Sequence, residues 1–156
     1  MYMKQTFALL LVLSGLCACH HLSLDEKWQQ QWDHYTHTQC PRRIDEGTVL
    51  DSVTYTFGEE RLFTRYMTVD SVADGDSVCT PELVEQLRQV LLLDIRGDLQ
   101  FRRMREAGVT FRCLYYSKKH PGLVRLDMVF RPEDYNQRPT DDTDSLSEQK
   151  NKEAES

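Results

Sequence analysis

Alternation of hydrophobic and polar residues predicts two adjacent strands in the first half of the chain. Residues 49–57 and 62–69 both alternate with a period of two, which is typical of strands with one buried face. The polar break Gly58-Glu59-Glu60 between them is short enough to predict a hairpin. One face of the first strand would carry Val49, Asp51, Val53, Tyr55 and Phe57.

A second pair of alternating segments predicts another hairpin further along. Residues 109–117 and 123–130 have the same period, and Lys118-Lys119-His120-Pro121-Gly122 supplies proline and glycine for the turn. Cys113 lies on the apolar face of its strand, so we expect it to act as a small buried hydrophobic residue.

The clearest helix start lies between the two hairpins, at Thr80-Pro81-Glu82, where an N-cap residue precedes a proline and an acid in the first turn. Gly97 is expected to end this helix, and Asp98 to cap a second short helix over residues 99–106. The predicted buried face of the first helix comprises Leu83, Val84, Leu87, Val90, Leu91 and Ile95.

An amphipathic helix is also predicted near the amino terminus, over residues 22–35. Leu24, Trp28, Trp32 and Tyr35 are spaced by four, four and three positions, which places them on a single stripe. Ser23 or Asp25 could cap it. Because the stripe is thin, we expect this helix to lie against the body of the protein or near a membrane.

The order strand, strand, helix, helix, strand, strand indicates an α+β fold. We predict one mostly antiparallel sheet of two β-hairpins with the helices on one face, forming a globular domain over residues 48–135. Residues 19–47 would form an N-terminal segment containing the first helix. Residues 136–156 are acidic and nearly without apolar residues, so they are predicted to be a disordered tail.

Residues 1–18 have the layout of an export signal. One lysine is followed by an apolar run and then by small residues, and the run is too short to span a bilayer. Leu16-Cys17-Ala18-Cys19 resembles the lipobox of bacterial lipoproteins, which implies that Cys19 becomes the acylated first residue of the mature chain. The alternative is an ordinary secretory signal with incidental cysteines.

Three further stretches strengthen this resemblance. With the lipobox, Cys40-Pro41, Asp51-Ser-Val-Thr-Tyr and Phe130-Arg-Pro-Glu-Asp-Tyr135 look like a group of small uncharacterised bacterial lipoproteins. The resemblance implies a cell-envelope protein, anchored in a membrane and facing the periplasm or the cell exterior. It implies no activity.

Export would place the remaining cysteines in an oxidising compartment, where disulfides persist. If Cys113 is buried within a strand, Cys40 and Cys79 remain as a possible disulfide pair between two predicted loops. Closing that loop would stabilise the fold by about 3 to 4 kcal/mol in the chain-entropy model.

The net charge of −6 is unevenly distributed. Residues 96–131 contain nine basic and three acidic side chains, whereas the tail after Thr140 is acidic. A basic stretch can bind nucleic acid, but an exported protein rarely meets it, so we expect no nucleic-acid partner. A solvated sheet face is the simpler interpretation.

No catalytic signature is present in the sequence, and no cofactor is predicted. His34, His37 and Cys40 are residue types that bind zinc, but a structural zinc site needs four ligands and the usual paired motifs are missing. Cys79 with His120 is the only pair that could act as nucleophile and base.

Two hypotheses about function follow. The first is a non-enzymatic, membrane-tethered binding or accessory module with an envelope protein or glycan as partner. Its binding surface would be Arg112, Tyr116 and Arg125, on the sheet face that the helices leave open. The alternative is an envelope enzyme or metal-binding protein that uses Cys79 or the region of His34, His37 and Cys40.

Overall fold

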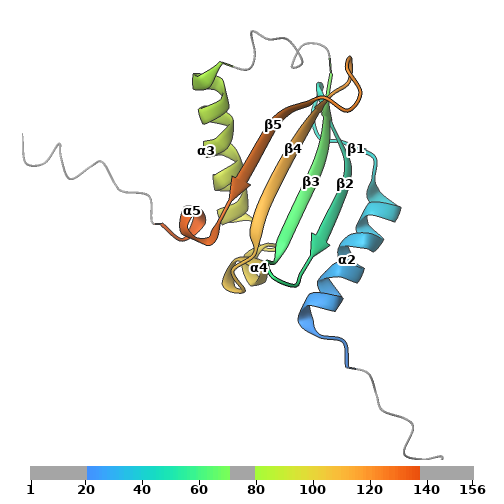
Figure 1. The fold of residues 1–156 in the computed structure, drawn as a ribbon, viewed down its shortest axis with the longest axis vertical. Coiled ribbons are helices and arrows are strands. Elements are labelled where there is room, and N and C mark those ends of the chain that lie inside the picture. Colours follow the sequence, from blue (N-terminus) through green and yellow to red (C-terminus); the bar gives the residue numbers. More distant parts are fainter. Residues whose placement is uncertain (1–20, 71–79, 138–156) are drawn as a thin grey trace, which may run out of the picture.

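The computed structural model describes residues 21–70 and 80–137, which form the predicted α+β fold. Its five-stranded sheet has the order β1 (Arg42–Arg43), β2 (Thr48–Thr56), β3 (Leu62–Val69), β4 (Thr110–Ser117) and β5 (Val124–Phe130) (Figure 1). The pairs β2 with β3 and β4 with β5 are antiparallel, so both predicted hairpins are confirmed. The strands β3 and β4 pair in parallel, which joins the hairpins into one mixed sheet.

Three helices cover one face of this sheet: α2 (Leu24–Gln39), α3 (Pro81–Gly97) and α4 (Arg102–Glu106). Trp32 of α2, Ile95 of α3 and Met104 of α4 belong to the same buried cluster as the inward-facing strand residues. Figure 1 shows α2 beside β2, and α3 on the side of β4 and β5. Helix α2, which lies within the predicted N-terminal segment 19–47, therefore shares one core with the later strands and helices.

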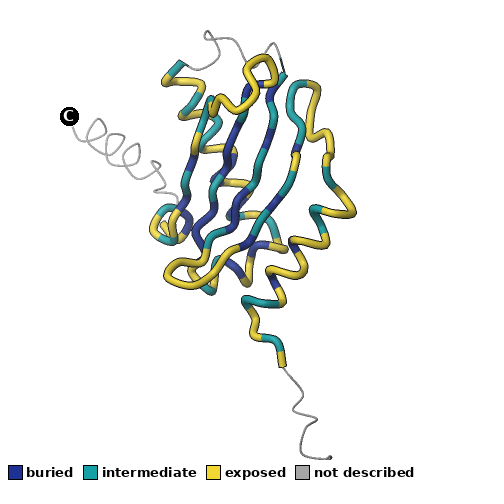
Figure 2. The backbone as a smooth tube through the Cα atoms, turned by 45° about the vertical axis from the view of Figure 1, so that its right-hand side comes forward, coloured by how far each residue is buried: buried dark blue, intermediate teal, exposed yellow. Residues whose placement is uncertain are grey.

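Aromatic rings fill the centre of the core. The Trp32 ring centroid lies 4.7 Å from that of Phe63, which in turn lies 5.3 Å from Phe101 and 5.8 Å from Phe111. Cys113 is 1 % exposed, as predicted for a buried thiol. Figure 2 shows the buried residues concentrated along the central strands, while the helices expose their outer sides.

A bulge changes the face pattern that the sequence predicts for β2. The register with β3 shifts between Leu50 and Ser52, which makes Asp51 the extra residue. Leu50 is consequently buried together with Val53 and Tyr55, whereas Asp51 is exposed. Val49 and Asp51 therefore do not share a face with Val53 and Tyr55 as alternation predicted, because simple alternation does not include a bulge.

The second helix between β3 and β4 is shorter than predicted. Helix α4 begins at Arg102, and residues 99–101 form a turn in which the Asp98 side chain accepts a hydrogen bond from the Gln100 amide at 2.7 Å. Asp98 therefore caps a turn. Leu99, in this turn, is 81 % exposed.

A helix that the sequence did not predict follows the last strand. Helix α5 (Pro132–Asn136) begins where the Asp134 carboxylate accepts a hydrogen bond from the Arg131 amide at 2.8 Å. Its Tyr135 is buried, and the phenol donates to the Val109 carbonyl at 3.0 Å. The predicted disordered tail lies outside the described residues from position 138 onward.

The sheet edge beside β2 is closed by a side chain of α2. The Thr36 hydroxyl donates to the Val53 carbonyl at 2.7 Å and accepts from the Val53 amide at 2.9 Å. Strand β1 pairs only with Leu50 and Val49 at the other end of this edge. Together they occupy backbone groups that could otherwise pair with another chain.

Among the helices that the structure describes, none combines the length and the apolar character needed to cross a membrane. The predicted signal sequence and Cys19 lie outside the described residues.

Candidate functional site

An apolar groove of about 530 Å³ lies between α3 and the sheet. Its floor consists of inward-facing residues from three strands, among them Met67 and Val69 of β3, Tyr115 of β4 and Leu126 of β5. One wall is α3, and the other is formed by Ile44, Asp45 and Thr48. This volume falls within the usual range of binding pockets.

The rims of the groove expose large apolar side chains. Leu83 is 44 % exposed, Val90 is 61 % exposed and Ile44, across the groove, is 48 % exposed. The sequence predicted Leu83 and Val90 to be buried, which was wrong. Apolar side chains gathered around a groove indicate a binding surface more strongly than scattered ones do.

The groove exists because α3 is fixed to the body at its carboxyl-terminal half. Leu91, Leu92 and Ile95 are buried, and Arg96 donates to the Tyr135 and Asp134 carbonyls at 3.2 and 2.7 Å. Arg88 donates to the Val129 carbonyl at 3.1 Å and lies 4.7 Å from the Phe130 ring centroid. In the first turns of the helix, before Arg88, Leu83 is exposed and Val84 and Leu87 are only half-buried, so the groove stays open there.

An ion pair between Arg65 of β3 and Asp94 of α3 lines the groove. Both terminal nitrogens of Arg65 donate to Asp94 Oδ2 at 3.1 Å, and the Arg65 guanidinium lies 5.8 Å from the Phe101 ring centroid. Burial raises the pKa of Tyr115 well above its ordinary range, so its phenol stays neutral. With an apolar floor and a neutral phenol, the groove is suited to binding an apolar group.

The predicted binding surface is divided between the two faces of the sheet. Arg112 and Tyr116 alternate with the inward-facing residues of β4 and lie together on the uncovered face. The Arg112 Nε atom donates to Asp127 Oδ1 at 2.8 Å. Arg125 lies at the bulge opposite Tyr115 and Tyr116 and lines the apolar groove. The structure thus unites Arg112 with Tyr116 and separates Arg125 from them.

The alternative site near the end of α2 is not assembled by the described residues. His34 and His37 are exposed on α2, and no cluster of three or more candidate metal ligands occurs within residues 21–70 and 80–137. Burial raises the pKa of the Cys40 thiol, which lowers its thiolate fraction. Cys79 lies outside the described residues, so its pairing with Cys40 stays a prediction.

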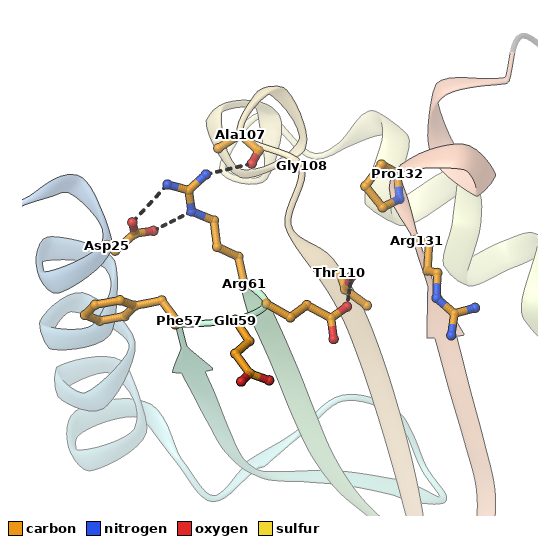
Figure 3. Close-up of a pocket in the computed structure, with 11 residues that line it drawn as sticks. Asp25, Phe57, Glu59, Arg61, Ala107, Gly108, Thr110, Arg131 and Pro132 are labelled. Carbon is orange, nitrogen blue, oxygen red and sulfur yellow. Dashed lines mark hydrogen bonds and ion pairs between the residues drawn. The ribbon is translucent and has the colours of Figure 1, made fainter.

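A second, polar cleft of about 500 Å³ lies at the opposite end of the sheet (Figure 3). There Asp25 accepts hydrogen bonds from Arg61 at 2.9 and 3.0 Å and from the Tyr55 phenol at 2.6 Å. Arg61 also donates to the Ala107 carbonyl at 3.1 Å. This network joins the first turn of α2 to the β2–β3 turn and to the end of α4.

We expect Asp25→Asn to destabilise the protein at neutral pH and to have little effect in acid. Hydrogen bonds from Arg61, and then from Tyr55, hold the pKa of Asp25 below its ordinary value of 3.8. A lowered pKa in the folded state stabilises the fold above the unfolded-state value, and this contribution disappears as the pH falls through the folded-state value. Urea unfolding at pH 7 should show a loss of about 1 kcal/mol, a modest size because Arg61 is partly exposed.

Asp33→Asn, on an exposed position of the same helix, is the matched control and should change stability little at either pH. A loss for Asp25→Asn that is equally large at pH 7 and at pH 2.5 would show that the ionised carboxylate is not what stabilises this end.

Sequence reasoning missed the groove because it assigned the rim residues Leu83 and Val90 to the buried face of α3. The available signal was the run of apolar residues Val90, Leu91, Leu92 and Leu93, which is too continuous for a single buried stripe. A helix with apolar residues around more than half of its circumference must bury a second side against something else or leave it open.

Comparison with known proteins identifies relatives of this chain. Residues 23–125 match the family model described as Domain of unknown function (DUF8479). No curated protein matches the sequence significantly.

Two solved structures share the fold. A protein of Pseudomonas aeruginosa described as secreted has a TM-score of 0.56 at 13 % identity, over 74 % of this chain and 99 % of its own. The pilotin EpsS of the Vibrio vulnificus type 2 secretion system has a TM-score of 0.53 at 9 % identity, over 73 % of this chain and 96 % of its own. At these identities the likeness concerns the fold.

Proposed function

The chain belongs to the DUF8479 family of domains of unknown function, and we propose that it is a membrane-tethered accessory protein of the cell envelope. In this proposal Cys19 carries the lipid anchor, and the groove beside α3 binds an amphipathic helix of another envelope protein. The observation that carries the proposal is the open apolar groove with Leu83, Val90 and Ile44 exposed along its rims.

The fold of the solved neighbours supports an envelope location for this function. One neighbour is described as secreted and the other is a pilotin of a secretion system, and each is covered almost completely by the match. A pilotin is an accessory protein, which fits a groove suited to binding. The lipobox resemblance at Leu16-Cys17-Ala18-Cys19 supports the same location independently.

The shape and charges of the groove favour a helix as its occupant. An amphipathic helix laid between α3 and Ile44 would bury the rim residues on both sides, as helices do in apolar grooves of other binding proteins. Asp45 and Asp94 lie at the groove, and Asp94 is 48 % exposed while it pairs with Arg65. Arg65 and Arg125 line the groove as well, so its charged side chains are of both signs and favour a partner that carries both basic and acidic residues beside its apolar stripe.

We expect a photo-crosslinking residue at Val90 to capture an envelope protein, and the same residue at Leu93 to capture none. The two positions lie on the same helix and are almost equally exposed, at 61 % and 62 %, but only Val90 lines the groove. Crosslinking in intact cells followed by mass spectrometry of the joined peptides is the measurement. The captured peptide should be amphipathic at helical spacing.

A charge in the groove should then abolish the capture. For this test the photo-crosslinking residue is placed at Leu83, on the rim of the same groove. Val90→Asp puts a carboxylate where the partner's apolar side chains would lie, so crosslinking from position 83 should fall about tenfold or more. Leu93→Asp adds the same charge outside the groove and should leave it unchanged. Equal capture from positions 90 and 93, or capture that survives Val90→Asp, would contradict the groove as the binding site.

A further inference from the structure

One end of the molecule gathers the start of α2, the β2–β3 turn and the segment around α4, and we call it the tethered end. The polar cleft shows this gathering, since its lining includes Asp25, Glu59, Arg61 and Ala107 from all three parts (Figure 3). In Figure 1 the start of α2, the β2–β3 turn and α4 lie together at one end of the sheet.

The groove lies toward the other end of the sheet. Thr56 pairs with Leu62 at the tethered end, whereas Thr48 pairs with Val69 at the far end. Thr48, Val69 and Leu83 all line the groove. A strand of eight residues is about 26 Å long, which sets the scale of the separation between the two ends.

The point where the lipid anchor would meet the body is fixed to the tethered end. The Ser23 hydroxyl accepts from the Glu26 amide at 3.2 Å, and the Ser23 amide donates to Glu26 Oε2 at 2.7 Å. Asp25, the second residue of α2, accepts hydrogen bonds from Arg61 and Tyr55. The start of α2 therefore cannot swing away from the body without breaking this network.

The chain between the anchor and this fixed point is short. Cys19 precedes Ser23 by four positions, which span at most roughly 14 Å even when fully extended. That reach is shorter than the sheet. If Cys19 is inserted in a membrane, this short segment must keep the tethered end of the protein near the lipid surface.

Large apolar side chains are exposed at this end. Leu24 is 48 % exposed, Phe57 is 40 % exposed and Leu99 is 81 % exposed. Glu59, Arg61 and Arg131 line the polar cleft together with Phe57 and carry charges of both signs, so the charges around Phe57 do not restrict it to one kind of lipid headgroup. Apolar side chains among polar neighbours are the pattern that contacts the boundary between headgroups and acyl chains.

We propose that the tethered end lies against the lipid bilayer, with Phe57 and Leu99 in contact with it, and that the groove faces away from the membrane. This inference rests on the lipid anchor at Cys19 in the proposed function. It adds an orientation: the partner helix is received on the side of the protein remote from the bilayer that holds the anchor.

Tryptophan variants of the mature acylated protein test this orientation in vesicles of phosphatidylethanolamine and phosphatidylglycerol. Brominated acyl chains quench a tryptophan that contacts the bilayer. Leu99→Trp should add fluorescence that is quenched by about a third or more, beyond the quenching of the buried Trp28 and Trp32 in the wild type. Leu123→Trp is the matched control, because Leu123 is 44 % exposed in the β4–β5 turn at the far end.

The outcomes separate this inference from the anchor itself. Quenching at position 99 and none at 123, unchanged by added salt, would support the orientation, and Phe57→Trp should then behave like Leu99→Trp. Acylated protein with equal quenching at 99 and 123, or with none at either, would overturn the orientation and leave the anchor intact. Absence of acyl mass on Cys19 would overturn both.

Discussion

Replacing Cys19 by alanine is expected to release the protein from membranes completely. Each acyl methylene buried in a bilayer stabilises binding by about 0.8 kcal/mol, and stable anchoring needs more than one chain. The Cys19→Ala variant loses every acyl chain at once. Intact mass should show the loss of the acyl groups, and fractionation should move the protein from the membrane to the soluble fraction. Folding should be unaffected, because Cys19 precedes the Ser23 cap of α2.

Cys17→Ala is the matched control for this experiment. It changes the neighbouring cysteine and leaves Ala18-Cys19 in place, so acylation and membrane association should persist. Loss of the acyl mass in Cys17→Ala and its retention in Cys19→Ala would contradict the assignment of the lipobox. Thiol labelling of the same samples would also report whether Cys40 and Cys79 are bridged.

Replacing Trp32 by alanine is expected to cause the largest loss of stability. Trp32 is 4 % exposed, and its ring lies 5.7 Å from that of Tyr35 and 6.1 Å from that of Phe101 in addition to its contact with Phe63. Removing a buried aromatic ring and leaving a cavity costs about 3 to 5 kcal/mol. That is a large part of the stability of an ordinary domain, so the urea midpoint should fall by more than 1 M.

Gln31→Ala is the matched control, since Gln31 is the exposed neighbour on the same helix and alanine is a good helix former. It should change the free energy of unfolding by less than about 0.5 kcal/mol. A loss below 1 kcal/mol for Trp32→Ala would mean that α2 adds little to the core.

Sequence patterns predicted the secondary structure well wherever a single local rule decides. The strands of both hairpins follow from alternation, and α3 begins at Pro81 because Thr80 caps it, its side chain accepting from the Leu83 amide at 3.4 Å. The helices also cover one face, as the order of elements implies. None of these features needs information from distant parts of the chain.

The candidate binding groove was harder to predict because it depends on distances between elements. Whether Leu83 is buried depends on how closely the first turns of α3 approach the strands, and that approach is set by anchors such as Arg88 and Arg96 further along the helix. Val90 lies among these anchors and is exposed on the rim of the groove. Likewise, the bulge in β5 moves Arg125 away from Arg112 and Tyr116. Without the bulge, alternation would pair Arg125 with Tyr116 and place all three residues on the same face of the sheet.

The parallel pairing of β3 with β4 is the one long-range strand pairing in the described sheet, and it joins two hairpins that are each local in sequence. Each hairpin pairs strands that are close in sequence, but in the parallel pairing Leu62 meets Thr110, 48 positions further along the chain. Closing so long a loop costs entropy before any pairing compensates for it, so contacts of this kind slow folding. Hydrogen exchange should therefore reveal two cooperative units, with α2, β2 and β3 opening as one and β4, β5 and α5 as the other. The groove spans both units, and an occupant that contacts each side would join them.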